Sequence, residues 1–133
     1  MKIKLHSTDN LDHYTATNEK GQTVALSGDG SAVGPMQSVL MAIAGCSTID
    51  IVMILKKMRQ DLQKIEVETE AKRREEIPKT FTEIHMHYKL YGEIKEKKAQ
   101  EAIDLSIEKY CSVSKMLEKA AEIKTSFVII PSA

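Results

Sequence analysis

Three segments at the N-terminal end show the alternation of hydrophobic and polar positions that is typical of short strands. Ile3 and Leu5 share one side of the first segment, and their polar neighbours occupy the other. Further strands are expected over residues 13–17 and 23–26. The asparagine and glycine of residues 18–21 tolerate the positive φ angles of a hairpin turn between them. The pattern therefore predicts a three-stranded N-terminal sheet.

A long helix is predicted over residues 35–60. Pro35 suits the first helical position, because its missing N–H would have no partner there. The first half of the helix has apolar residues on all sides, and basic residues near its end favour the negative pole of the helix dipole. Since one small sheet covers only one side of such a helix, we expect a second copy of the chain to cover the rest in a homodimer.

The hydrophobic period changes to two over residues 62–75 and again over residues 81–91. These segments predict a long hairpin with one face toward water and one toward the core. The inward positions of its second strand are Ile84, Met86, Tyr88 and Leu90.

Two helices and a strand are predicted in the C-terminal part. Helical spacing covers residues 96–110, and a short helix follows that Ser112 or Ser114 can cap. Residues 127–130 form the last strand. The order of three strands, a long helix, two strands, two helices and one strand indicates an α+β fold. At 133 residues we expect a single domain, 1–133.

Charge and composition narrow the class of protein. The net charge is zero, which argues against a nucleic-acid or anionic-membrane partner, since either would favour a basic excess. The first residues lack the apolar core of a signal peptide. The longest apolar stretch, residues 39–55, is interrupted by polar residues and is short for a membrane span. We therefore expect a soluble cytoplasmic protein.

The two cysteines are the main candidates for chemistry. Cys46 lies on the apolar helix, where a free cysteine is ordinarily a small buried packing residue. Cys111 lies just before the short helix, where unpaired N–H groups stabilise a thiolate, although it could equally pack beside Tyr110. Two thiols suggest redox chemistry if the fold brings them together. A disulfide would be transient in the reducing cytoplasm.

Other polar groups favour no metal or cofactor site. His85 and His87 lie two apart on a strand and could bind a metal, but no third ligand is evident, and a solvated sheet face explains them as well. The chain has neither a CxxC motif nor cysteines and histidines at zinc-finger spacing. Arg73 and Arg74 belong to a sign-balanced cluster, a solvated strand end from which one arginine could still reach a site.

Three parts of the sequence resemble the OsmC/Ohr superfamily of osmotically inducible and organic-hydroperoxide-resistance proteins, and its YhfA-like branch in particular. They are Gly34-Pro35 followed by a helix with Ala44-Gly45-Cys46, the segment from Tyr110 to Leu117, and the hairpin between residues 73 and 92. The resemblance covers nearly the whole chain, and the order of predicted elements agrees with it.

The resemblance implies an intertwined homodimer with two active sites at the subunit interface. It implies that Cys46 attacks a peroxide oxygen, that the resulting sulfenic acid condenses with Cys111, and that an external dithiol reduces the disulfide. This is the chemistry of a cysteine-based, peroxiredoxin-like peroxidase in oxidative-stress defence, and it needs no cofactor or metal. An apolar pocket would favour organic hydroperoxides.

The sequence departs from the active members at two positions. They supply an arginine from the N-terminal strands and a glutamate shortly after the proline, whereas here no arginine precedes Arg59 and the nearest equivalent of the glutamate is Gln37. Gln37, Arg73 and Arg74 are candidate supporting residues for the thiols. The departure leaves an alternative open, a dimer that binds a small apolar or acyl ligand and has lost peroxidase activity.

Overall fold

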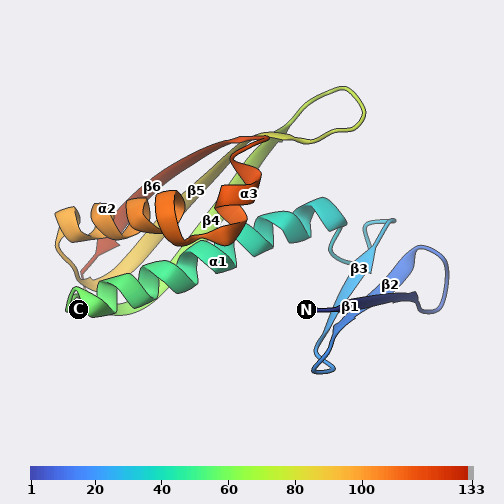
Figure 1. The fold of residues 1–133 in the computed structure, drawn as a ribbon, viewed down its shortest axis with the longest axis horizontal. Helices are drawn as coiled ribbons and strands as arrows, with labels where there is room; N and C mark the ends of the chain where they lie inside the picture. Colours follow the sequence, from blue (N-terminus) through green and yellow to red (C-terminus); the bar gives the residue numbers. More distant parts are fainter. Residues whose placement is uncertain (132–133) are drawn as a thin grey trace. The chain divides into compact units, whose positions relative to one another are not determined.

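The computed structural model describes residues 1–131 and forms two compact units, Met1–Val39 and Leu40–Ala133. The first unit holds an antiparallel sheet in the order β1 (Ile3–Ser7), β2 (His13–Asn18) and β3 (Thr23–Ser27) (Figure 1). Gly21 has a φ of 80° in the turn between β2 and β3, where a side chain would be strained. The three predicted N-terminal strands and their hairpin turn are confirmed.

His13 joins the two loops at one end of the first unit. Its Nδ1 lies 2.8 Å from an Asp9 carboxylate oxygen, and its Nε2 lies 2.9 Å from an oxygen of Asp29. These hydrogen bonds raise the pKa of His13 above its ordinary value, Asp9 contributing most. The pKa of Asp9 is lowered mainly by His13, and that of Asp29 mainly by hydrogen bonds from Ser31. The loops are therefore held by a charge-dependent clamp.

The second unit is built on a sheet in the order β4-β5-β6. β4 (Asp61–Arg73) and β5 (Phe81–Glu93) form the predicted long antiparallel hairpin, and β6 (Glu122–Ile130) pairs with β5 in parallel. A parallel neighbour needs a crossover connection, which the C-terminal helices supply. β6 begins five residues before the predicted strand, at Glu122 rather than 127.

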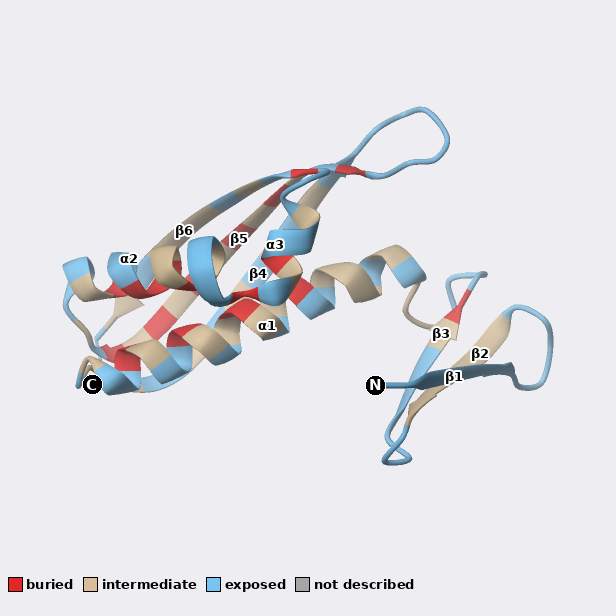
Figure 2. Cartoon of the chain, in the orientation of Figure 1, coloured by how far each residue is buried: buried red, intermediate tan, exposed pale blue. Residues whose placement is uncertain are grey.

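Two helices cover the same face of this sheet: α1 (Pro35–Lys57), from Leu40 onward, and α2 (Glu96–Leu105) (Figure 1). The second unit buries its core between them and β5 (Figure 2). The four predicted inward positions of β5 are all fully buried, and α1 contributes Ile43, Ile51 and Leu55. The alternation in the sequence therefore located this core correctly.

The predicted helix over residues 96–110 changes its winding near its end. α2 gives way to a π-helical turn, η1 (Ser106–Tyr110), and α3 (Ser112–Leu117) follows. Cys111 occupies the N-cap of α3 and accepts a hydrogen bond from the Ser114 backbone N–H. The prediction that Ser112 or Ser114 caps this helix is wrong, because the thiol takes the capping position.

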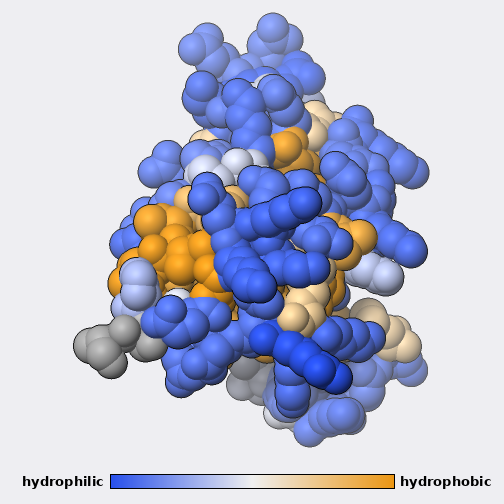
Figure 3. Space-filling view, turned by 90° about the vertical axis from the view of Figure 1, so that its left-hand side faces the viewer, coloured by the Kyte–Doolittle hydropathy of each residue, from blue (hydrophilic) through white to orange (hydrophobic). Residues whose placement is uncertain are grey.

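One side of α1 stays uncovered in the single chain. Met41, Ile49 and Met53 are 56%, 63% and 53% exposed, and apolar atoms gather on the molecular surface in Figure 3. By length and composition α1 is also able to cross a membrane. That is weak evidence for a span, because core helices of soluble proteins pass the same test, and α1 buries its other side against the sheet.

Candidate functional site

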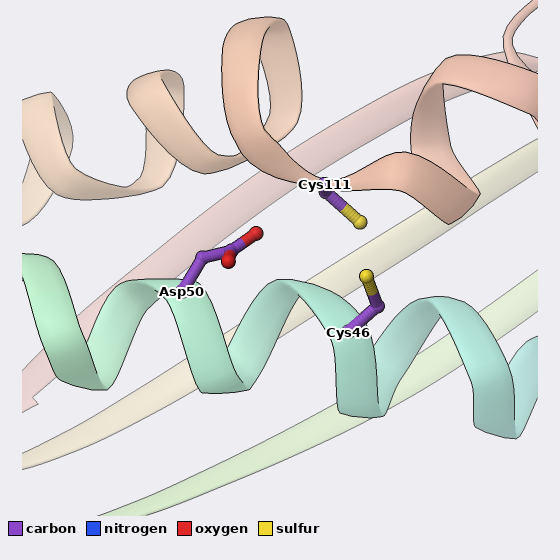
Figure 4. A group of neighbouring side chains, drawn as sticks. All are labelled: Cys46, Asp50 and Cys111. Atoms are coloured by element: carbon purple, nitrogen blue, oxygen red, sulfur yellow. The ribbon is translucent and has the colours of Figure 1, made fainter.

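Cys46 lies on α1, and Cys111 is the residue that joins η1 to α3. Their side chains face each other (Figure 4). The Sγ atoms of Cys46 and Cys111 and a carboxylate oxygen of Asp50 all lie within 4.8 Å of one another. The sequence leaves the distance between the sulfurs open, and the structure brings them together inside one chain, in the second unit. Both cysteines are free thiols.

Burial of the two thiols differs from the expectation for Cys46. In the single chain Cys46 is half-buried, whereas Cys111 is fully buried. Cys46 is therefore not fully enclosed in the core of the single chain.

Cys46 and Asp50 lie four residues apart on α1, and this spacing places both side chains on one helix face. Asp50 is the only acidic residue in this 23-residue apolar helix. Asp50 is not among the site residues that the sequence pattern predicts. Two features of the sequence could have identified Asp50: it is the single acidic residue of an apolar helix, and it lies four residues after a cysteine.

The π-helical turn and the start of α3 together position Cys111. The Cys111 backbone N–H donates to the Ser106 carbonyl at 2.7 Å, and Cys111 Sγ accepts from the Ser114 N–H at 3.4 Å. Burial raises the pKa of the Cys111 thiol, the hydrogen bonds from Ser114 oppose this, and the neighbouring Cys46 thiol adds to the rise. The expected N–H stabilisation of a Cys111 thiolate is present, but burial outweighs it.

A buried polar chain lies beneath the three groups. The Ser47 and Tyr88 hydroxyls are 2.6 Å apart, and the Ser106 hydroxyl donates to Asp50 Oδ2 and to the Ser47 carbonyl, both at 3.2 Å. Burial raises the pKa of Tyr88 to about 12; the Ser47 hydrogen bond opposes the shift, while the charges of Cys111 and Asp50 add to it. Tyr88 is therefore a neutral phenol at physiological pH.

A cavity of about 320 Å³ adjoins the site at Asp50. Met53, Ile54 and Leu105 give it apolar walls, and Lys57 adds a positive charge. It has room for a small organic molecule with one end beside the carboxylate.

Within residues 1–131, no hydrogen bond or ion pair joins the predicted supporting residues to either thiol. Gln37, in the first unit, accepts the Gly34 N–H at 2.9 Å at the start of α1. Arg73 donates to the Lys79 carbonyl, and Arg74 pairs with Glu76 at 3.1 Å, both within the β4–β5 hairpin. Their supporting role stays a prediction.

The histidine pair on β5 has a shared partner. His85 Nε2 and His87 Nδ1 lie 2.9 and 2.7 Å from the Ser126 hydroxyl on the neighbouring strand. These contacts tie β5 to β6 on the face opposite the helices.

Comparison with known proteins identifies the chain's relatives. A model of the family described as OsmC-like protein matches residues 28–126, which span the boundary between the two units. The chain is 42% identical over 120 residues to the protein YhfA of Escherichia coli K12, a match that covers 88% of this chain and 90% of that protein.

Solved structures agree over nearly the full length. A hypothetical protein from Aquifex aeolicus has a TM-score of 0.90 at 30% identity, covering 99% of this chain and 97% of that one. The organic hydroperoxide resistance protein OhrB of Bacillus subtilis has a TM-score of 0.71 at 14% identity, covering 96% and 98%. At that identity, the second likeness shows a shared fold and nothing further.

Proposed function

The chain belongs to the OsmC-like protein family, and on that premise we propose that it is a dithiol redox protein that reduces organic hydroperoxides. The observation that carries the proposal is the separation of the Cys46 and Cys111 sulfurs, within 4.8 Å of each other. A modest side-chain movement converts such a pair into a disulfide. The half-buried Cys46 and the apolar cavity lined by the neighbouring Asp50 favour an organic substrate.

The proposed reaction has three steps. The Cys46 thiolate attacks the terminal oxygen of the hydroperoxide; an S–O bond forms, the O–O bond breaks, and the alkoxide leaves as an alcohol after taking a proton. The Cys111 sulfur then attacks the sulfenic sulfur of Cys46, an S–S bond forms, and hydroxide leaves as water. An external dithiol exchanges with the disulfide, is itself oxidised, and returns both thiols.

The test is consumption of cumene hydroperoxide with dithiothreitol as the reductant, for the wild type, Cys46→Ser and Cys111→Ser. We expect Cys46→Ser to fall to the rate without protein. Without the reductant, one equivalent of hydroperoxide should convert Cys111→Ser to a sulfenic acid that a dimedone-type probe captures, whereas the wild type should form the disulfide. Equal rates for the wild type and Cys46→Ser would remove Cys46 from the chemistry.

A homodimer in the cytoplasm is part of the same proposal. The uncovered side of α1 supports it, since Met41, Ile49 and Met53 are apolar and more than half exposed in the single chain. Sedimentation equilibrium should return a dimer at micromolar concentration. A monomer alone would contradict it and leave the thiol chemistry standing, because both sulfurs belong to one chain.

The cavity favours a second candidate function, the binding of a small apolar or acyl ligand without peroxide chemistry. Its apolar walls would hold the chain of such a ligand, and Lys57 at its edge would favour a carboxylate head. Ligands of this class should raise the melting temperature of both the wild type and Cys46→Ser. No shift across a panel of fatty acids and thioesters would count against it.

A further inference from the structure

The thiol pair shares its surroundings with a carboxylate, and the nearest cation that the cavity lining shows is Lys57, seven residues beyond Asp50 on α1. Cys46, Cys111 and Asp50 can each carry a negative charge, and their donor atoms lie within 4.8 Å of one another (Figure 4). In residues 1–131, no lysine, arginine or histidine makes a hydrogen bond or ion pair with any of the three, and Asp50 accepts from the Ser106 hydroxyl. Negatively charged groups this close together, one of them fully buried and two half-buried, are stabilised by a bound cation.

We propose that the reduced protein binds one zinc ion through Cys46 Sγ, Cys111 Sγ and a carboxylate oxygen of Asp50, with the fourth position open to water or a small ligand. Two thiolates select a borderline-soft ion such as zinc over magnesium or calcium, which prefer oxygen donors. Three protein ligands with one open position is the arrangement of reactive zinc sites. The inference departs from the expectation that the protein binds no metal.

Distances among the donors fit this ion after a small contraction. A tetrahedral zinc with its usual bond lengths holds sulfur and oxygen donors roughly 3.5–3.8 Å apart. The donors here lie within 4.8 Å of one another, so each donor–donor distance must shorten by about 1.3 Å at most. Cys46 and Asp50 are half-buried and can rotate. Their spacing of four residues on one helix is also the spacing at which helical zinc motifs present two ligands.

The surrounding hydrogen bonds already orient two of the three ligands. Ser106 donates to Asp50 Oδ2 at 3.2 Å, and the Ser114 N–H donates to Cys111 Sγ at 3.4 Å. Such outer partners hold metal ligands in position and tune their basicity. The cavity beside Asp50 gives an ion a route to the site and gives the open position room for a fourth ligand.

Zinc binding and disulfide formation exclude each other, because the disulfide removes both thiolates. The inference uses the same sulfurs as the proposed redox function but does not depend on peroxide chemistry. The two can therefore fail separately in experiments on the wild-type protein.

The experiment titrates the reduced full chain with zinc sulfate, in competition with a chromophoric chelator of known affinity. We expect one zinc per chain for the wild type, and no binding after oxidation to the disulfide. Asp50→Asn should weaken binding at least tenfold, and Ser106→Ala by about 10- to 100-fold. Asp104→Asn, a helical aspartate outside the three-ligand group, is the matched control and should keep the wild-type affinity.

Cobalt gives a readout that does not depend on the folding of any variant. The wild type loaded with cobalt should show a near-ultraviolet sulfur-to-metal charge-transfer band and the visible bands of a tetrahedral ion. Less than one zinc per chain, or a cobalt spectrum without the sulfur band, would overturn the site, as would an Asp50→Asn variant with unchanged affinity. If the wild type consumes hydroperoxide but binds no zinc, the zinc site alone is overturned. If it binds zinc but consumes no hydroperoxide, only the proposed peroxidase activity is overturned.

Discussion

The hydrogen bond between Ser47 and Tyr88 beneath the thiol pair allows a quantitative test of the buried core. Tyr88→Phe removes one hydroxyl, but Ser47 keeps its bond to the Ala44 carbonyl at 3.2 Å. We therefore expect a loss of about 1 kcal/mol in the free energy of unfolding, the net value of one hydrogen bond.

Ser47→Ala should cost more, although it too removes a single hydroxyl. It leaves the fully buried Tyr88 hydroxyl with only the Met86 sulfur, a weak acceptor at 3.3 Å. An unsatisfied buried hydroxyl costs about 1–3 kcal/mol, and the better helix propensity of alanine returns at most about 0.5 kcal/mol. The double variant removes both polar groups and should be close to Tyr88→Phe alone, so the coupling energy equals the loss for Ser47→Ala, about 0.5–3 kcal/mol.

Urea unfolding followed by far-ultraviolet circular dichroism measures all four proteins, at one protein concentration because a dimer's stability depends on it. Ser38→Ala is the matched control, since Ser38 lies on the same helix and donates to the Pro35 carbonyl at 2.6 Å without a buried partner. It should change the unfolding free energy by less than about 0.5 kcal/mol. Additive single changes, or a larger loss for Tyr88→Phe than for Ser47→Ala, would refute the reasoning.

Two further predictions concern the ends of the two sheets. His13 should titrate above its ordinary pKa of 6.5 in an NMR experiment, and Asp29→Asn should lower the midpoint. Protonated His13 therefore stabilises the folded protein fully below pH 6.5, and this stabilisation is lost as the pH rises through the raised pKa of His13. Asp9 and Asp29 stabilise the folded protein above about pH 3.8, and their stabilisation is lost as the pH falls through their lowered pKa values. A midpoint unmoved by Asp29→Asn would contradict the clamp. Gly92→Ala should destabilise the protein by at least about 1–3 kcal/mol in urea unfolding, because Gly92 has a φ of 137° and a Cβ there would overlap the Asp61 carbonyl. Gly28→Ala, which meets no such obstacle, is the control, and equal losses would refute the steric argument.

Local pattern was enough to predict most of the second unit's core. The alternation of Ile84, Met86, Tyr88 and Leu90 fixed both the strand and its buried face, because a period of two leaves no other way to hide four large side chains. The start of β6 was missed, since the alternation of Glu122 to Ser126 is weak in hydrophobic residues. Its parallel pairing depends on a crossover, which no local pattern encodes.

The site was predictable in its sulfurs and not in its carboxylate. Cys46 and Cys111 stand out as the only cysteines, but their proximity depends on the packing of η1 against α1. Asp50 reads in the sequence as a polar interruption of an apolar helix, and only the fold shows that it faces both sulfurs. Gln37 is a candidate only through the family resemblance, and Arg73 and Arg74 only through their place in a charged cluster at a strand end, so their part stays a prediction.

The widened turn η1 also fixes the length of the chain at this point. Cys111 bonds five residues back to Ser106, so one residue more is accommodated there than an α-helical turn would hold. Deleting that extra residue would let the helix close regularly and swing everything after it by about 100° around the axis. The direction in which the Cys111 side chain points therefore depends on the number of residues in this turn. Homologues with a turn of different length would need another local structure to keep their two thiols facing each other.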